Sequence, residues 1–177
     1  MRIAACFLIV CSVCGSEAQR LRADTPRGTV IHGTACVVDG LVITASHVVE
    51  GETARIEVDA RWVNCTVQRR DTGKDIVLLK PDEPLPDSCA SGSGIWAAIG
   101  QPADKEHPPQ QLPVRRLEFG WNKSRLTCAG YASGGSGAPI YIDGRLFGIS
   151  VAAERDPDRP EEATVVVYIP VAAICRK

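Results

Sequence analysis

The sequence predicts an all-β fold built from two antiparallel β-barrels. Short runs of β-branched and other apolar residues recur along the 177-residue chain, and Asp-Gly turns separate some of them. A segment rich in proline, serine and glycine divides these runs into two sets of about six. Because a barrel closes its own edges, two barrels would leave no long strand edge open to other chains.

The first barrel is expected over residues 29–82. Asp39-Gly40 between two apolar runs is a strong signal for a tight hairpin turn. The segment before this barrel, residues 19–28, is polar and contains three arginines, so we predict a flexible leader there. The strands of the first set are predicted at 29–31, 34–38, 41–45, 54–58, 62–68 and 76–80.

A linker is expected next, and the second barrel after it. Residues 81–94 contain three prolines and end in Ser-Gly-Ser-Gly, and we assign the linker to residues 83–94. The second barrel then occupies residues 95–177, and its last residues, 171–175, are expected to form one or two helical turns. Its strands are predicted at 95–99, 112–119, 125–128, 138–142, 145–152 and 164–169.

Residues 1–18 have the pattern of a secretory signal. Arg2 precedes an apolar run, and Ser16-Glu17-Ala18 offers small residues to a signal peptidase. The run is too short to span a bilayer. A lipoprotein site at Cys11 or Cys14 is disfavoured because valine precedes each cysteine, and a buried N-terminal strand is the other alternative. We predict cleavage after Ala18 and a secreted protein, periplasmic if the source is bacterial.

Composition restricts the partners. A hydrophobic content of 45% and a formal charge of −1 are typical of a soluble globular protein. This near-neutral net charge does not indicate binding to nucleic acid. No basic cluster indicates binding to an anionic membrane after signal cleavage. The sequence does not predict the oligomeric state.

Five cysteines remain after the predicted signal is removed. Export permits disulfides, but an odd number leaves at least one cysteine outside any intrachain pair, and the sequence leaves the pairing open. No Cys-x-x-Cys pair occurs among them and the histidines are scattered, so we expect no metal site. These cysteines are Cys36, Cys65, Cys89, Cys128 and Cys175.

Ser136 is the candidate nucleophile. It lies in residues 133–139, Ser-Gly-Gly-Ser-Gly-Ala-Pro, directly before a hairpin predicted around Asp143-Gly144. Glycines permit unusual dihedral angles and close approach. A serine held in this way can attack a carbonyl while neighbouring backbone N–H groups receive the oxyanion. The alternative for this motif by itself is a glycine-rich surface turn.

His47 is the candidate base among three histidines. A serine hydroxyl is a weak nucleophile and needs a base, which itself needs an orienting group. The apolar strand 41–45 delivers His47 on a short turn at its exit. His107 lies in a proline-containing loop and is expected to be solvated, and His32 lies within a strand and is expected to be structural.

Asp75 is the candidate orienting carboxylate. It stands at the beginning of the apolar run Ile76-Val77-Leu78-Leu79, where it can lie beside the core and still accept a hydrogen bond from an imidazole. Asp71 is the nearest competitor, but a turn containing Gly73 separates it from this strand.

Three segments together resemble the chymotrypsin-like serine peptidases. Thr44-Ala45-Ser46-His47 is similar to the family's Thr-Ala-Ala-His, and residues 75–79 to its Asp-Ile-Ala-Leu-Leu. Gly134-Gly135-Ser136-Gly137-Ala138-Pro139 is similar to its Gly-Asp-Ser-Gly-Gly-Pro. The order of the three is the family's order, and the layout agrees over nearly the whole mature chain. The resemblance implies a trypsin-like pair of Greek-key barrels, protein or peptide substrates and no cofactor.

The resemblance also implies a role for each candidate catalytic residue. Ser136 would attack the peptide carbonyl, His47 would take its proton, and Asp75 would orient the imidazole and stabilise its cation. The backbone N–H groups of Gly134 and Ser136 would form the oxyanion hole. The product is an acyl-enzyme intermediate, which water then hydrolyses.

Five further positions match the family's substrate-binding residues. Ser150, Val151 and Ala152 match the strand that pairs with the substrate backbone. Gly130, six residues before the serine, matches the pocket floor, and Tyr131 stands next to it. Because no carboxylate lies there, a neutral, small or apolar side chain is expected before the scissile bond.

Two departures distinguish the chain from the digestive enzymes, and the segments His47-Val48-Val49 and Tyr168-Ile169-Pro170 favour the compact HtrA/Deg-like and viral branches. Val48 follows His47, so the digestive enzymes' disulfide at this position is absent. Gly135 replaces the aspartate that receives the new N-terminal ammonium group after zymogen cleavage. We therefore predict that the catalytic domain needs no such cleavage.

Two other functional classes remain as alternatives. One is a catalytically inactive, peptidase-like binding protein, although all three triad residue types are present. The other is a lipase or esterase of the α/β-hydrolase fold, which would place its histidine after the serine. No histidine follows Ser136.

Overall fold

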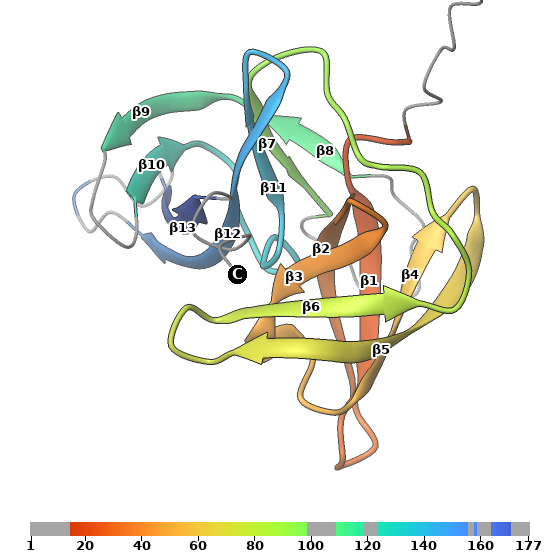
Figure 1. Cartoon of the computed structure of the whole chain (residues 1–177). Coiled ribbons are helices and arrows are strands. Elements are labelled where there is room, and N and C mark those ends of the chain that lie inside the picture. Colours follow the sequence, from red (N-terminus) through yellow and green to blue (C-terminus); the bar gives the residue numbers. More distant parts are fainter. Residues whose placement is uncertain (1–14, 99–108, 119–123, 156–157, 159–163, 171–177) are drawn as a thin grey trace, which may run out of the picture.

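The computed structural model describes residues 15–98, 109–118, 124–155, 158 and 164–170. These residues form thirteen strands and one short 3₁₀-helix, which confirms the predicted all-β class. Figure 1 shows the strands in two groups, β1–β6 below and β7–β13 above and to the left. No helix in the described part of the chain is long and apolar enough to cross a lipid bilayer.

The first group is a closed six-stranded barrel, in the order β1-β2-β3-β6-β5-β4, and is called the first barrel here. Pairing of Leu21 with Ile56 closes the ring between β1 and β4. Asp39 and Gly40 both have positive φ, 51° and 73°, as a two-residue hairpin turn requires. The strands are β1 Gln19–Asp24, β2 Val30–Val38, β3 Leu41–Ala45, β4 Thr53–Val58, β5 Arg61–Asp71 and β6 Ile76–Pro81.

Alternating apolar side chains fill this barrel. Each fully buried Leu or Ile stabilises the fold by about 1.5–3 kcal/mol relative to an exposed side chain. The largest buried side chains of the barrel are Leu21, Val37, Ile43, Ile56 and Leu79, none more than 2% exposed.

The predicted leader over residues 19–28 is wrong, because residues 19–24 form strand β1. Leu21 and Ala23 are 0% and 2% exposed, whereas Arg20 and Arg22 are half-buried and Asp24 is exposed. Arg20 and Arg22 lie over the ring of Trp62, with the Arg22 guanidinium 4.3 Å from the ring centroid. Long arginine stems can cover apolar surface while the charge stays in water. The arginine-rich composition therefore led to a wrong prediction for a strand in which buried and less buried side chains alternate as usual.

The second group forms a seven-stranded sheet, in the order β8-β7-β11-β12-β13-β10-β9, called the second sheet here. Strands β8 and β9 stand at opposite edges, yet only Pro113 separates them in the chain. The sheet must therefore curl until its two edges meet at this proline. The strands are β7 Gly94–Ala97, β8 Gln110–Leu112, β9 Val114–Glu118, β10 Ser124–Cys128, β11 Pro139–Ile142, β12 Arg145–Arg155 and β13 Thr164–Pro170.

The second sheet differs from the prediction in two respects. Residues 112–119 were expected as one strand but divide at Pro113, which has no N–H to donate to a ladder. The edges β8 and β9 are not paired with each other, so within the described residues the second unit is a curled sheet rather than a closed barrel. The helical turns predicted at 171–175 lie outside the described residues, as do residues 1–14 of the predicted signal.

The two groups share a core and a connecting segment. Ile149 and Val151 of β12 belong to the same buried cluster as the first barrel. The connecting residues run along β2, where Ser88 N–H donates to Val37 O at 2.9 Å. No disulfide joins any two of the four described cysteines, Cys36, Cys65, Cys89 and Cys128, and burial raises the pKa of the Cys65 thiol to about 12.

Candidate active site

His47 lies on a short helical turn, η1 Ser46–Val48, directly after β3. Ser46 and Val48 are 7% and 1% exposed, whereas half of the imidazole surface of His47 is exposed. The buried neighbours fix the turn and direct the imidazole outward. The Ser46 N–H also donates to Asp75 O at 2.9 Å, which ties this turn to the beginning of β6.

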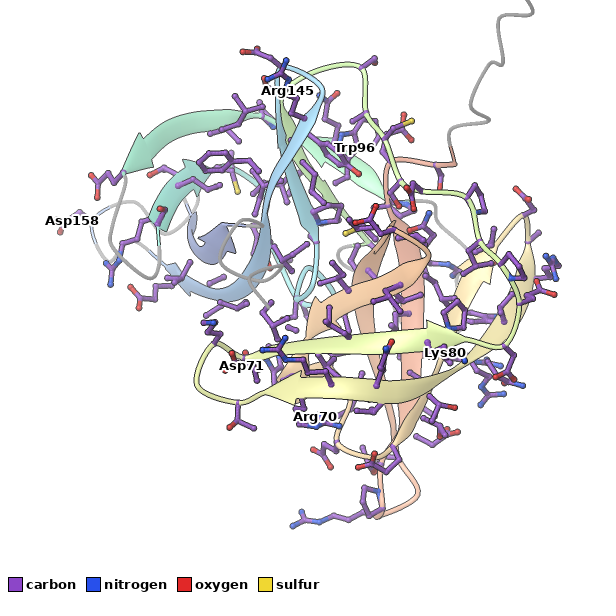
Figure 2. All side chains as sticks on the ribbon, in the orientation of Figure 1. Arg70, Asp71, Lys80, Trp96, Arg145 and Asp158 are labelled. Atoms are coloured by element: carbon purple, nitrogen blue, oxygen red, sulfur yellow. The ribbon has the colours of Figure 1, made fainter. Side chains whose placement is uncertain are left out.

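Arg70 holds the same turn from β5, and no sequence motif indicates it. Its Nη1 donates to Val49 O at 2.5 Å and to both the carbonyl and the hydroxyl oxygen of Ser46. Its Nη2 donates to Gly51 O at 2.7 Å. Figure 2 shows Arg70 on β5 below the β3–β6 pair, close to Asp71 at the end of the strand. One guanidinium thus satisfies the carbonyls at the end of the turn that carries His47.

Asp75 engages His47 with both carboxylate oxygens. Its Oδ1 accepts the His47 backbone N–H at 2.9 Å, and its Oδ2 lies 2.6 Å from His47 Nδ1. Asp75 has a φ of 56°, in the left-handed region that aspartate tolerates better than most residues. This conformation brings the carboxylate beside the imidazole although Asp75 immediately precedes β6.

Asp71, the competing carboxylate, has a different partner. Its Oδ2 lies 3.2 Å from Lys74 Nζ, and its Oδ1 accepts the Lys74 N–H at 3.1 Å. The hydrogen bond from the Lys74 side chain holds the pKa of Asp71 below its ordinary value. Asp71 therefore stabilises the β5–β6 turn, and the choice of Asp75 over Asp71 agrees with the geometry.

Ser136 completes a continuous line of hydrogen bonds. Its Oγ lies 2.9 Å from His47 Nε2, although 89 residues separate the two in sequence. With Nδ1–H donating to Asp75, Nε2 is the unprotonated nitrogen and accepts from the hydroxyl. The structure thus brings the three predicted catalytic residues into one line across the boundary between the first barrel and the second sheet.

Residues 132–138 are called the glycine loop here. Backbone conformation or lack of space requires glycine at its positions 134, 135 and 137. Gly134 and Gly137 have φ of 91° and 86°. A Cβ at Gly137 would lie 2.0 Å from Thr34 O and 2.1 Å from Thr44 Oγ1. A Cβ at Gly135 would lie 2.6 Å from the Tyr131 ring. The loop is therefore packed tightly from both sides, by the first barrel and by Tyr131.

The two amides predicted for the oxyanion hole are among those that the glycine loop leaves without a backbone acceptor. Gly135 N–H donates to Ala132 O at 3.1 Å, and Gly137 N–H donates to Ser150 O at 2.7 Å. For the N–H groups of Gly134 and Ser136, the described part of the chain provides no acceptor. Both N–H groups therefore stay available as donors beside the nucleophile candidate Ser136.

The five predicted substrate-binding residues have different environments. Tyr131 and Ser150 are buried and joined by a hydrogen bond between their hydroxyls, and burial raises the pKa of Tyr131. Val151 is the extra residue of a bulge in β12, and its side chain enters the shared core. Gly130 and Ala152 are exposed. The structure therefore brings Tyr131 and Ser150 together under the glycine loop and leaves Gly130 and Ala152 at the surface.

Comparison with solved structures identifies the fold. The active form of the Rv3671c protease from M. tuberculosis superposes with a TM-score of 0.67 over 90% of this chain and 78% of its own, at 16% identity. The chain has a chymotrypsin-like peptidase fold. A serine endoprotease from Yersinia pestis gives a TM-score of 0.67 at 18% identity, and the HtrA-type protease AlgW with a tripeptide gives 0.66 at 16%.

This chain matches only part of the length of the last two structures. The match covers 91% and 90% of this chain but only 61% and 57% of the Yersinia and AlgW chains. No family model matches the sequence. No curated protein matches it either. The predicted chymotrypsin-like fold is therefore confirmed by shape, at a sequence identity too low to carry an activity by itself.

Proposed function

We propose that this protein is a secreted serine endopeptidase that uses Ser136, His47 and Asp75 as its catalytic triad. One observation carries the proposal. The contacts Asp75 Oδ2 to His47 Nδ1, at 2.6 Å, and His47 Nε2 to Ser136 Oγ, at 2.9 Å, form one line through both halves of the fold. A base within hydrogen-bond reach of its nucleophile, itself oriented by a third group, is the arrangement that covalent catalysis needs.

In the acylation step, Ser136 Oγ attacks the peptide carbonyl carbon while His47 Nε2 takes the hydroxyl proton. Asp75 keeps the imidazole in the required tautomer and stabilises its cation. The N–H groups of Gly134 and Ser136 donate to the oxyanion. As the C–N bond breaks, His47 gives the proton to the departing amine and the acyl-enzyme remains.

In deacylation, water takes the place of the amine. His47 removes a proton from water, the hydroxide attacks the acyl carbon, and the proton returns to Ser136 Oγ as the carboxylic acid leaves. General base catalysis contributes about 10²–10⁴-fold to such steps, and one oxyanion donor contributes about 10²–10³-fold. No cofactor takes part.

We also propose that the residue before the scissile bond is neutral and small or apolar. Gly130 brings no side chain to the position of the pocket floor, and the Tyr131 ring fills the space against Gly135. No carboxylate lies at either position to pair with Arg or Lys. A peptide library read by mass spectrometry tests this preference, and cleavage mainly after Arg or Lys would contradict it.

Activity without zymogen-type cleavage is supported by two features. Strand β1 closes the first barrel, so removing residues 19–27 would open it rather than activate it. The Tyr131 ring occupies the space that an aspartate at Gly135 would need. Sequencing the N-terminus of the active exported protein checks this. A start at Gln19 agrees with signal cleavage after Ala18, and an active form that begins only at Gly28 contradicts the proposal.

A fluorophosphonate probe tests the catalytic proposal directly. The probe is expected to label the wild-type protein at Ser136, and Ser136→Ala is expected to abolish the labelling while the thermal unfolding curve is unchanged. Folded wild-type protein that takes no label would instead favour the inactive, peptidase-like binding protein.

A further inference from the structure

Thr34 of β2 is fully buried and bonds to parts of the chain that are distant in sequence. Its backbone N–H donates to Ser136 O at 2.9 Å, and its Oγ1 donates to Gly134 O at 2.8 Å. Ala98, just after β7, donates its N–H to the same Oγ1 at 2.9 Å. Thr34 therefore connects the first barrel, the glycine loop and the second sheet.

The direction of the Thr34 hydroxyl proton follows from its neighbours. Because Ala98 N–H points at Oγ1, the oxygen is the acceptor in that contact, and the hydroxyl proton is directed at Gly134 O. Thr34 therefore holds the carbonyls of Gly134 and Ser136. The Gly134 carbonyl belongs to the peptide group that joins Gly134 to Gly135, and the Ser136 carbonyl to the one that joins Ser136 to Gly137. Both peptide groups adjoin the residues whose N–H groups form the proposed oxyanion hole.

The glycine loop needs such restraint from outside. Glycine has more backbone freedom to lose than any other residue, and Gly134, Gly135 and Gly137 surround Ser136. Oxyanion donors are effective only when they already point at the developing charge before the reaction begins. A misplacement of about 1 Å can cost about 10²-fold in rate.

Thr34 is itself fixed by the strand that leads to His47. Thr44 Oγ1 donates to Thr34 O at 2.7 Å, and both threonines are 0% exposed. Thr44 lies three residues before His47 in the segment Thr-Ala-Ser-His. One buried line of hydrogen bonds therefore runs from the strand that carries the base to the loop that carries the nucleophile.

We propose that Thr34 is a positioning residue whose hydroxyl, by holding the Gly134 carbonyl, fixes the glycine loop so that the Gly134 and Ser136 N–H groups keep their oxyanion-binding orientation. The inference rests on the proposed peptidase function and adds a residue that no catalytic motif contains. Thr34 acts through the loop backbone and does not touch the substrate. Its loss should therefore lower the rate of acylation and leave the acid–base behaviour of His47 unchanged.

Two variants that differ by a single oxygen atom test this role. Thr34→Ser keeps the hydroxyl, and Thr34→Ala removes it. We expect kcat of Thr34→Ser to stay within about threefold of wild type, and kcat of Thr34→Ala to fall about 10–100-fold with KM unchanged. The midpoint of the pH–rate profile should be the same in all three proteins, since Thr34 does not contact His47 or Asp75. Equal kcat for the Ser and Ala variants would overturn the proposal.

Thr25→Ala is the matched control. Thr25 also lies in the first barrel, is 9% exposed, and accepts the Thr29 N–H at 3.1 Å, but it does not touch the glycine loop. It should lose stability without losing kcat, and a loss of kcat equal to that of Thr34→Ala would also overturn the proposal. If Thr34→Ala does not fold, Thr34→Val restores the volume without the hydroxyl and is compared with Thr34→Ser in its place.

The fluorophosphonate reaction separates the two proposals. Failure of the folded wild type to react removes the peptidase function and this inference with it. If the wild type reacts and Thr34→Ala reacts as fast as Thr34→Ser, the peptidase proposal stands and only the proposed role of Thr34 is refuted. A labelling rate reduced about 10–100-fold in Thr34→Ala alone supports it.

Discussion

The first barrel and the second sheet hold the proposed catalytic residues in different ways. In the first barrel, His47 and Asp75 sit at the ends of neighbouring strands, and Arg70 of the same barrel ties down the turn. In the second sheet, Ser136 sits in a loop of glycines whose carbonyls are held by Thr34 of the first barrel. The proposed base is therefore positioned by its own unit, whereas the loop of the proposed nucleophile is also held by the other unit.

This contrast predicts where the site is most sensitive to substitution. A change at the base should act on chemistry with little effect on the loop. A change at the glycine loop should disturb the contact between the two units. Changes in the remaining part of the first barrel should act mainly on stability.

The largest expected effect is on the carboxylate. Asp75→Asn should lower kcat by about 10⁴-fold, because an amide presents the imidazole with a donor as well as an acceptor and favours the wrong tautomer. Asp71→Asn is the control, since Asp71 pairs with Lys74 and not with His47. Steady-state kinetics on a peptide substrate measures both. An Asp75→Asn enzyme within tenfold of wild type would exclude Asp75 from the proposed triad.

The next effect concerns the contact between the two units. Gly137→Ala should lower kcat by about 10²-fold and also lower the melting temperature, because its Cβ would lie 2.0 Å from Thr34 O and displace the glycine loop. Gly28→Ala is the matched control, with a similar φ of 79° but no atom within 4 Å of the added Cβ. If both variants lose the same stability and keep activity, the loop is not packed as described. Thermal unfolding and kcat together distinguish these results.

Arg70→Met should have an intermediate effect. It removes the donors that satisfy the Ser46, Val49 and Gly51 carbonyls but retains most of the aliphatic stem. We expect a loss of about 1.5–3 kcal/mol in the free energy of unfolding, as is typical for hydrogen bonds to a charged group. A fall in kcat of about tenfold should follow from looser placement of His47. Chemical unfolding and kinetics measure the two, and a kcat equal to that of wild type would show that the turn holds its shape without Arg70.

The smallest effect is a pH dependence of stability that arises from His32. Burial, and then the charges of Arg22 and Arg20, lower the pKa of His32 below its ordinary value of 6.5. The unfolded chain therefore takes up this proton first as the pH falls through about 6.5, and the folded state loses stability until His32 itself is protonated. Urea unfolding between about pH 7.5 and 5.5 should show a shallower decline in His32→Gln than in wild type, and an identical decline would contradict it.

Local sequence signals were sufficient for much of the molecule. Asp39-Gly40 and Asp143-Gly144 mark turns between strands that the structure shows. His47 and Asp75 could be predicted because one apolar run leads to His47 and another begins directly after Asp75. Turn chemistry and strand alternation act over a few neighbouring residues, so both can be recognised in the sequence. Strand β1 was not predicted because its less buried positions carry Arg20, Arg22 and Asp24, so its composition resembled that of a flexible segment.

Other features depended on which distant surfaces meet. Thr34 and Gly134 are 100 residues apart in sequence, and Arg70 lies 24 residues from Ser46. No spacing rule encodes such pairs, since they form only when the second sheet packs on the first barrel and when Arg70 of β5 meets the turn η1. The sequence by itself determined most of the strands, the Asp-Gly turns and the chemical types at the candidate site. Only the tertiary structure decided which carbonyls of the candidate site accept hydrogen bonds from Thr34 and Arg70 and which amides keep a free N–H. Long-range packing sets those contacts.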